Sequence, residues 1–400
     1  MKLPLLLVAL SAAFAQSFTQ RGFLESGVSL YPQTVPGDSS LAIDESLFRY
    51  EAFYRVWPAI SIAGGLDARF DTHQEAERAF GLSWWDRGAR RPAFEVRRLG
   101  VTYTRGKFAL VAGKQFIRWG KTDILNPTDR FAPRDYVNLV DNDFLGVTAI
   151  RATYGTASDT LDAIFEPRLT PSRMPLLGQR WFQLPAGLPV TEQAPDFPGG
   201  PQYGARWNHI GALAEYSLSF YNGFDNLPLY ASALAPSGIA IRRYYPRMRM
   251  YGGDLAVPLA AVTLKAEAGY FTSATPSSDE YALYVVQLDR QAGEWNFAGG
   301  YAGQLITRHG VAPVASLLRG STRAFVAHAG YTIDVNRSVS FETVIRQNGA
   351  GAYFKPEYTQ AFGQHWRVTA GFVLIRGQAT DFLGQYHANS HAVLTVRYSF

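Results

Sequence analysis

The chain has 400 residues, 14% of them aromatic, a formal net charge of +5 and no cysteine, and its mean hydropathy of -0.09 is close to neutral. The missing cysteines exclude disulfides, thiolate metal sites and a lipoprotein anchor. Beyond the N-terminal segment no apolar run reaches the about 20 residues that a membrane-spanning helix needs, which excludes an inner-membrane helix bundle. Since the sequence contains neither a basic tail nor a basic helix, nucleic acid is not expected as a partner.

The first fifteen residues have the three parts of a secretory signal peptide. Lys2 supplies the charged start, Leu3 to Ala12 the apolar core, and Ala13-Phe14-Ala15 the small-residue cleavage site. We therefore expect residues 1–15 to be removed and residues 16–400 to form one exported domain. Two classes remain open, a soluble secreted β-protein and an outer-membrane β-barrel, because a barrel alternates lipid-facing and polar residues and keeps its mean hydropathy low.

The sequence alternates between apolar and polar residues in segments of about ten residues, a pattern typical of strands with one polar face. In the segment 60–71, Ile62, Leu66 and Phe70 share one face while Asp67 and Arg69 share the other. We predict one all-β domain, a transmembrane up-and-down antiparallel barrel of about eighteen strands, with about sixteen as the alternative. The predicted strands are 20–32, 44–57, 60–71, 93–105, 108–119, 145–155, 159–166, 203–212, 213–224, 244–257, 261–273, 280–290, 293–306, 322–333, 337–348, 351–362, 364–376 and 388–400.

The predicted connections mostly alternate between short and long. Short turns such as 57–59, 105–107 and 155–158 come between long polar stretches, namely 72–92, 120–144, 167–202, 225–243, 307–321 and 377–387. A barrel has this asymmetry because its periplasmic turns are tight and its extracellular loops are long. A soluble sandwich would also set charged residues opposite apolar ones, but it has no reason to sort its loops by side.

The last strand carries the most specific local pattern. Its apolar face is formed by Ala392, Leu394, Val396, Tyr398 and Phe400. An aromatic C-terminal residue after an alternating strand resembles the terminal strand that outer-membrane barrels present to the barrel-assembly machinery. We therefore expect Tyr398 and Phe400 to act as the assembly signal.

Three stretches carry a family resemblance: RWGKTDILNPTDRFAPRDY at 118–136, FYNGFDNLP at 220–228 and YALYVVQLDR at 281–290. They resemble the outer-membrane porins, in particular a poorly characterised group similar in style to alginate-export and phosphate-selective porins. The resemblance implies a channel in the outer membrane of a Gram-negative bacterium. Its partners would be outer-membrane lipid and lipopolysaccharide, the barrel-assembly machinery and small hydrophilic solutes, and a homo-oligomer is compatible with it.

Charged residues on the polar faces are expected to line the pore, since a charge at the lipid face costs about 2–4 kcal/mol at mid-bilayer. Positively charged residues, mostly arginines, outnumber the carboxylates among them, which favours anionic solutes. The alternative is that arginines and carboxylates pair across strands and only fill a polar interior. The predicted pore-lining residues are Arg49, Glu51, Arg55, Asp67, Arg69, Arg98, Arg151, Lys265, Glu267, Glu342, Arg346, Arg367 and Arg397.

The segment 120–144 is predicted to constrict the pore, because it combines both charges with Pro127 and Pro133. An ordinary surface loop is the alternative, and the longer segment 167–202 is its rival for the role. The candidate constriction residues are Lys121, Asp123, Asp129, Arg130, Arg134 and Asp135.

No cofactor, metal or catalytic residue is predicted. Asp141-Asn142-Asp143 lacks the spaced ligands of a calcium loop. His365, His387 and His391 lie near the C-terminus with Ser390 and Asn389, but these adjacent positions cannot all point the same way on a strand, and no G-x-S-x-G motif occurs. The competing function is therefore not an enzyme but a barrel that serves as a binding or adhesive scaffold through long outer loops.

Overall fold

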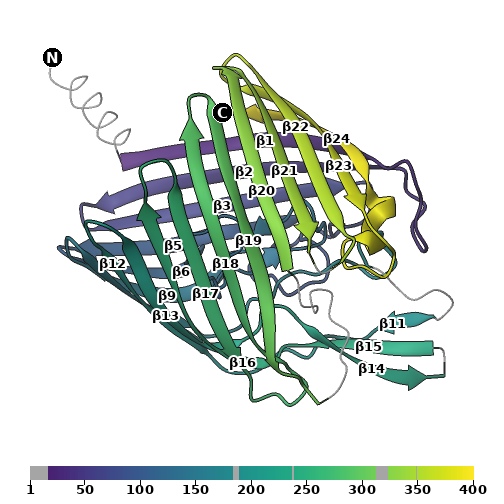
Figure 1. The fold of residues 1–400 in the computed structure, drawn as a ribbon, viewed down its shortest axis with the longest axis horizontal. Helices are drawn as coiled ribbons and strands as arrows, with labels where there is room; N and C mark the ends of the chain where they lie inside the picture. The colour runs from purple at the N-terminus through teal and green to yellow at the C-terminus, as the bar shows by residue number, and fades with distance from the viewer. Residues whose placement is uncertain (1–16, 183–188, 237, 312–322, 348) are drawn as a thin grey trace, which may run out of the picture.

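The computed structural model describes residues 17–182, 189–236, 238–311, 323–347 and 349–400, so the expected signal peptide lies outside the described residues. Eighteen strands form one antiparallel barrel (Figure 1), which settles the strand number in favour of eighteen. These strands are β1 (Phe18–Leu30), β2 (Ala42–Trp57), β3 (Ile60–Asp71), β5 (Phe94–Arg105), β6 (Phe108–Gln115), β9 (Val147–Gly155), β10 (Asp159–Glu166), β12 (Gln202–Ile210), β13 (Glu215–Phe224), β16 (Arg247–Pro258), β17 (Thr263–Thr272), β18 (Glu280–Ala292), β19 (Trp295–Arg308), β20 (Arg323–Asp334), β21 (Arg337–Arg346), β22 (Ala352–Phe362), β23 (Trp366–Arg376) and β24 (His391–Ser399).

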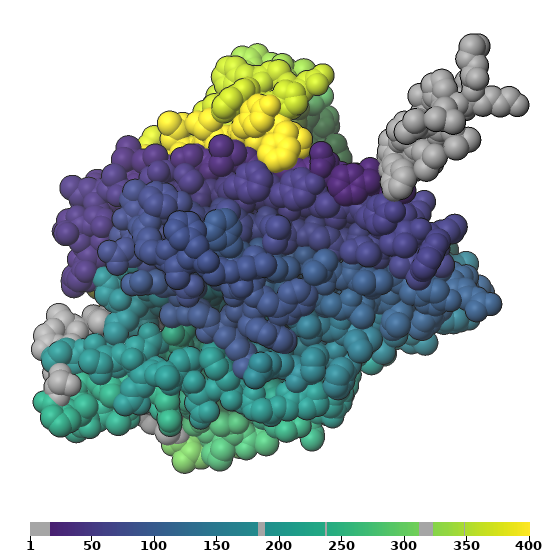
Figure 2. Space-filling model, turned by 180° about the vertical axis from the view of Figure 1, so that it is seen from behind, coloured from purple at the N-terminus to yellow at the C-terminus, as the bar shows by residue number. Residues whose placement is uncertain are grey.

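The barrel closes where its first strand pairs with its last. β1 pairs with β24 in the antiparallel register Phe23↔Ser399 to Leu30↔Ala392. Beyond that ladder, the amides of Gly22 and Phe400 each donate to the other residue's carbonyl oxygen at 3.0 Å. In Figure 2 the yellow C-terminal strand accordingly lies along the purple N-terminal one. Closure leaves no unpaired sheet edge in the barrel, as a strand-built membrane protein requires.

Connections along the described barrel mostly alternate between tight turns and longer loops, as predicted. The tight turns include 58–59, 106–107 and 293–294, where Gly106 and Gly293 both have a φ of 58°. Glycine adopts this left-handed conformation without the steric cost that a Cβ brings. The long connections all lie at the other end of the barrel, so loops from distant parts of the sequence meet there.

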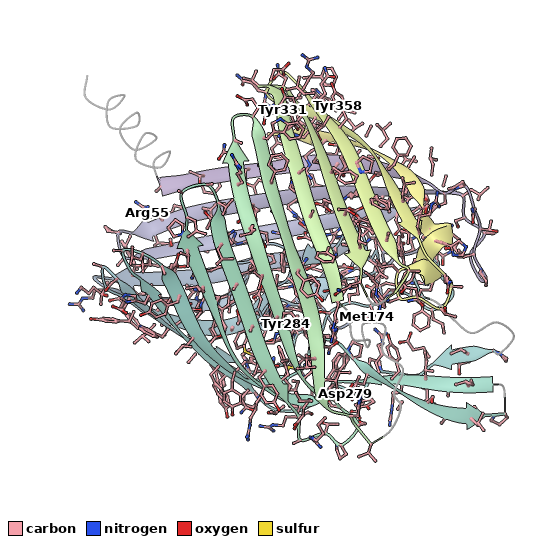
Figure 3. All side chains as sticks on the ribbon, viewed as in Figure 1. Arg55, Met174, Asp279, Tyr284, Tyr331 and Tyr358 are labelled. Carbon is pink, nitrogen blue, oxygen red and sulfur yellow. The ribbon has the colours of Figure 1, made fainter. Side chains whose placement is uncertain are left out.

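The outer face of the wall is apolar. Outward residues such as Leu66, Ile150 and Leu218 are 45%, 47% and 62% exposed, while polar residues of the same strands such as Asp67, Arg151 and Ser217 are turned inward. At the turn end the outward residues are aromatic, with ring centroids 4.6 Å apart for Trp295 and Tyr331 and 5.0 Å apart for Trp366 and Tyr398. Figure 3 places Tyr331 and Tyr358 at this end. An apolar band that ends in an aromatic girdle is the surface of a barrel embedded in a bilayer.

The structure departs from the predicted elements in the loops. β6 ends at Gln115 rather than at residue 119, because the chain leaves the wall there and buries Ile117 and Trp119 inside the barrel. The predicted loops 167–202 and 225–243 contain a separate three-stranded sheet of β11 (Val190–Glu192), β14 (Leu229–Ala235) and β15 (Gly238–Tyr244), which projects outside the barrel (Figure 1). Short pieces β4 (Leu82–Ser83), β7 (Arg134–Asp135), β8 (Asp143–Phe144) and the 3-10 helix η1 (Gly384–Asn389) also lie in predicted loops. No helix in the described ranges is both long and apolar enough to cross a bilayer.

Gly22 at the barrel seam gives a direct test of closure. A Cβ built on Gly22 would lie 2.5 Å from the Phe400 ring and 2.7 Å from the Arg49 carbonyl oxygen. We expect Gly22→Ala to destabilise the barrel by about 1–3 kcal/mol, since overpacking at a close contact forces neighbours to shift. The readout is the temperature at which the folded, fast-migrating band is lost in SDS gels. Gly27→Ala in the same strand is the control. A Cβ on Gly27 would have the Thr395 hydroxyl as its nearest neighbour, at 3.3 Å, so this substitution should destabilise the barrel less.

Candidate functional site

The segment between β6 and β9 crosses the interior of the barrel. It contains the predicted constriction loop 120–144, and its residues contact strands on opposite sides of the wall. Asp143 binds Arg49 of β2, whereas Asp123 binds Lys265 of β17. In the ring order β2, β3, β5, β6, β9, β10, β12, β13, β16, β17 these two strands are nine steps apart, which is half of the eighteen-stranded circuit. A segment tied to both sides must span the lumen.

One set of ties joins the loop to β17 and β18. The Glu267 carboxylate accepts hydrogen bonds from the amide and hydroxyl of Thr128, both at 2.8 Å, and from the Thr122 hydroxyl at 3.0 Å. Asp123 pairs with the Lys265 ammonium at 2.8 Å, and its amide donates to Gln287 at 2.9 Å. Because Glu267 is almost fully buried, these charge-assisted bonds hold the loop against the wall without competition from water.

Other ties reach the remaining walls. The Lys121 ammonium lies 2.9 Å from Glu215 of β13 and 3.0 Å from Asp254 of β16. Asp141 pairs with Lys355 of β22 at 2.8 Å. The loop is thus anchored on four sides of the barrel.

A hydrophobic cluster inside the barrel supports the loop from beneath. Trp119 and Phe131 of the loop pack edge to face at 5.5 Å, and Phe131 packs in the same way on Tyr221 of β13 at 5.1 Å. Met250 and Phe271 of the wall complete this buried cluster. Apolar inward residues on β13, β16 and β17 therefore mark the part of the lumen that is filled rather than open.

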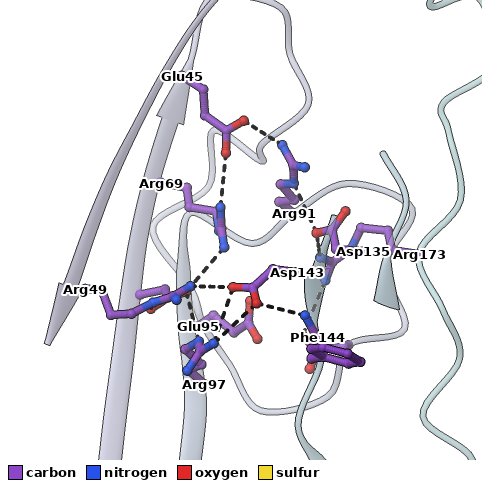
Figure 4. A network of polar contacts seen from close by, with 12 residues as sticks. Glu45, Arg49, Arg69, Arg91, Glu95, Arg97, Asp135, Asp143, Phe144 and Arg173 are labelled. Atoms are coloured by element: carbon purple, nitrogen blue, oxygen red, sulfur yellow. Dashed lines mark hydrogen bonds and ion pairs between the residues drawn. The ribbon is translucent and has the colours of Figure 1, made fainter. Parts of the chain in front are cut away.

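Asp135 is the centre of a buried polar network that holds several loops together (Figure 4). Its carboxylate accepts hydrogen bonds from Arg91 at 3.0 Å and from Arg173 at 2.5 Å. Arg91 also pairs with Glu45 near the start of β2, at 2.9 Å. Burial alone would raise the pKa of Asp135, but the Arg91 and Arg173 guanidinium groups hold it well below its usual range.

Residues 167–182 of the rival segment 167–202 also fold into the loop end of the barrel. Arg173 reaches Asp86 and Asp135, and Arg180 lies with its guanidinium 3.6 Å from the centre of the Tyr31 ring. Trp181 packs on Tyr386 of η1 with centroids 5.7 Å apart. Segments 120–144 and 167–182 therefore both fold into the barrel, and the second packs against the first.

A polar path lies beside the constriction loop, between it and the wall formed by β1, β2, β22, β23 and β24. A cavity of about 430 Å³ at the loop adjoins one of about 570 Å³ that extends to the turn between β20 and β21. Glu25, Glu357 and Arg397 line both, so the two cavities are adjacent, and together they are called the polar route. The charged side chains along it are Arg49, Arg69, Arg91, Arg337, Arg367 and Arg397, together with Glu25, Glu45, Asp135, Asp141, Asp143, Asp334 and Glu357.

The predicted pore-lining residues lie on the inward face of their strands, and most of them pair with a neighbouring charge. Arg49 binds Asp67, Arg69 binds Glu45, and Arg397 binds Glu25. In the same way Glu51 lies near Arg98, Arg151 binds Asp162, Arg346 binds Asp381, Lys265 binds Asp123, Glu267 anchors the loop, and Glu342 faces His328. Within the described ranges, Arg367 and the exposed Arg55 at the turn end have no ion pair (Figure 3).

The six constriction-loop candidates divide into two groups. Asp123 and Asp135 line cavities of the lumen. The others support the loop: Lys121 binds the wall, Asp129 accepts the Trp119 amide at 3.0 Å, and Arg130 and Arg134 lie over the Phe271 and Phe144 rings at 5.1 and 4.0 Å. Burial raises the pKa of Asp129 to about 6 despite the nearby Arg118 and Arg130.

Several residues of the network were not predicted. Glu25 and Glu45 could have been found, since both fall on the polar face of an alternating strand. Arg97 could not, because it precedes Arg98 and only one of two neighbours faces inward on a regular strand. A register shift between Gly65 and Leu66 in the β3–β5 pairing accommodates both arginines, and Arg97 reaches Asp143 at 3.3 Å.

His73 joins three outer loops, and its titration is expected to make their stability depend on pH. The two ring nitrogens of His73 lie 2.8 Å from Asp38 and 3.2 Å from Glu75. The Gln179 side-chain amide donates a hydrogen bond to the His73 carbonyl oxygen at 2.7 Å. Burial disfavours the imidazolium, but the hydrogen bonds and charges of Glu75 and Asp38 outweigh burial and raise the pKa of His73.

A raised histidine pKa means that the contact stabilises the folded loops below the ordinary value of about 6.5 and loses this effect as pH rises through the folded value. We expect amide exchange in residues 72–80, corrected for its intrinsic pH dependence, to become faster across that rise. His73→Gln should exchange fast at every pH. A pH-independent rate in the unmodified chain would contradict the role of the imidazolium.

The fold matches that of solved porins. No family model matches the chain, and no curated protein matches it in sequence. Three structural matches are the BenF-like porin from Pseudomonas fluorescens Pf-5 (TM-score 0.59, 10% identity, 96% of this chain and 97% of that one), Acinetobacter baumannii OccAB3 (0.56, 9%, 96% and 99%) and Pseudomonas aeruginosa OpdQ (0.54, 11%, 96% and 98%). At such low identity the likeness shows the porin barrel fold over nearly the whole chain. It does not extend to the alginate-export or phosphate-selective style expected from the sequence.

Proposed function

We propose that this protein is a channel of the bacterial outer membrane through which small hydrophilic solutes diffuse. The observation that carries the proposal is the pair of adjacent polar cavities beside the constriction loop, lined by charged side chains from β1, β2, β22, β23 and β24. The apolar outer band supports the location in a bilayer, and the porin fold supports export to the outer membrane. An eighteen-stranded barrel is also wide enough for an aqueous channel.

The anion preference expected from the arginine count is not part of this proposal. Six guanidinium groups and seven carboxylates line the route, so their charges nearly cancel. Most of them are also paired, and a paired arginine attracts a passing anion less than a free one does. We propose a channel of weak ion selectivity in which local pairs orient solutes.

The test is single-channel recording of refolded protein in planar bilayers, with the reversal potential measured under a salt gradient. We expect discrete conductance steps and a reversal potential close to zero. Glu25 and Arg397 provide matched variants, because they form one ion pair at 2.5 Å within the route. Glu25→Gln should shift the reversal potential toward anions and Arg397→Gln toward cations by a similar amount. Silence from protein shown to be folded would overturn the channel.

We do not propose the scaffold role. The segments 120–144 and 167–182 fold into the barrel and are occupied by contacts with its wall and with each other. The β11, β14 and β15 sheet does project from the barrel, with Leu234 91% exposed, but nothing along it identifies a partner.

A further inference from the structure

A second cavity in the lumen differs in character from the polar route. It has a volume of about 640 Å³ and lies on the other side of the constriction loop, against β19 to β23. Leu139 and Val140 of the loop face it, while Asn142 lines both this cavity and the polar route. The short segment 139–143 therefore separates an apolar compartment from a charged one.

The lining of this apolar compartment combines aromatic and aliphatic side chains from five separate parts of the chain. Trp181 comes from the second inserted loop, Tyr353 from β22, and Phe382 and Tyr386 from the loop before β24. Val344 of β21 and Ile375 of β23 add aliphatic surface. Part of this set forms a packed cluster around Trp181, Val373, Ile375 and Tyr386, so the surface is preformed.

The charged groups at this compartment are acidic. Asp123 and Glu342 line it together with His328, and no arginine or lysine does so. Asp123 is neutralised by Lys265 at 2.8 Å. Glu342 faces Lys355 in the strand register, but the Lys355 ammonium turns away to Asp141 at 2.8 Å and Glu357 at 3.4 Å. Among the described residues the ion-pair contact left to Glu342 is the His328 ring, at 3.6 Å.

Apolar surface exposed inside a water-filled channel is unfavourable, and an apolar ring that covers it releases that cost. Aromatic rings also attract cations to their faces, most strongly where water is excluded. A carboxylate that pairs with no lysine or arginine adds a specific attraction for a positive charge at the rim of the same surface. The three features select one class of ligand.

We propose that the apolar compartment binds an amphipathic cation, an ammonium group joined to an aromatic or alicyclic ring. The ring packs against Tyr353, Tyr386 and Val344, and the ammonium group lies at Glu342. This inference rests on the proposed function in that the ligand reaches the compartment through the lumen. The channel would then bind one class of solute at this site, in addition to the solutes that pass along the polar route.

The experiment is isothermal titration calorimetry on the refolded, detergent-solubilised chain, with 2-phenylethylammonium as the probe. 3-Phenylpropionate is the matched anion, and ethylammonium is the cation without a ring. We expect 2-phenylethylammonium to bind and the other two to bind at least about tenfold more weakly. Glu342→Gln should weaken the binding of 2-phenylethylammonium about tenfold, because one charged hydrogen bond is lost. Glu25→Gln, which removes a carboxylate of the polar route that pairs with Arg397 and not with Lys355, should leave the affinity for 2-phenylethylammonium unchanged.

Equal or tighter binding of 3-phenylpropionate would overturn the inference, as would an unchanged affinity in Glu342→Gln. Calorimetry does not require an open pore, so the two proposals fail separately. A folded chain that binds the probe but gives no conductance steps rejects the channel and keeps the site. A conducting chain that does not bind the probe keeps the channel and rejects the site.

Discussion

Replacing residues 137–141 by two glycines should raise the single-channel conductance about twofold or more, because an eighteen-stranded barrel without an inserted loop leaves an aqueous channel. The replacement removes Leu139, Val140 and Asp141, which stand between the two compartments. It keeps the β7–β8 pairing of Arg134 with Phe144 and of Asp135 with Asp143, so the rest of the loop has its anchors.

The control for this loop variant is a chain that lacks residues 232–240. These residues belong to the β14–β15 hairpin, which lies outside the barrel (Figure 1). Its conductance should equal that of the unmodified chain. A loop variant that also conducts like the unmodified chain would show that segment 139–143 does not limit the pore.

The second large effect is expected for Asp135→Ala. The substitution leaves the guanidinium groups of Arg91 and Arg173 buried without their shared carboxylate. Removing one partner of a buried ion pair costs about 3–5 kcal/mol, because the remaining charge stays out of water. We expect loops 72–93, 120–144 and 167–182 to loosen together, which should appear as protease cleavage within them and as increased current noise.

Asp141→Ala is the matched control for Asp135→Ala. Asp141 belongs to the same loop and also pairs with a cation, but its side chain is 46% exposed, so its loss should cost little. The unmodified chain should reproduce the Asp135 effect in acid. The lowered pKa of Asp135 means that its stabilisation of the fold is present above the ordinary value of about 3.9. This stabilisation is lost as pH falls below that value toward the lower pKa of the folded state.

The wall of the barrel was predictable because its signal is local. A strand with one lipid face alternates at every second residue, and each of the eighteen predicted strands corresponds to one in the structure. Where two inward-facing residues adjoin, as at Arg97 and Arg98, the alternation rule fails because a shift in pairing register is set by the neighbouring strand. The end of β6 was missed for a similar reason, since Ile117 and Trp119 continue the strand pattern but are buried against residues about a hundred positions away.

The interior was less predictable, because its contacts join residues far apart in the chain. Composition identified 120–144 as charged and stiff, yet nothing in the sequence distinguishes the roles of its charged residues Lys121, Asp129 and Asp135. One ties the loop to the wall, one is buried against a backbone amide, and one is the centre of an arginine pair. The apolar compartment was not anticipated, since its lining comes from strands and loops spread between residues 123 and 386.

The anchors of the constriction loop also have a mechanical consequence. A single curved sheet flattens easily, because bending it breaks none of its hydrogen bonds. Here a cross-brace runs through the middle, with Asp143 held at β2, Lys121 at β13 and β16, Asp123 at β17 and Asp141 at β22. We therefore expect a change in bilayer thickness or lateral pressure that deforms the wall to act on these ion pairs, and through them on the width of the passage.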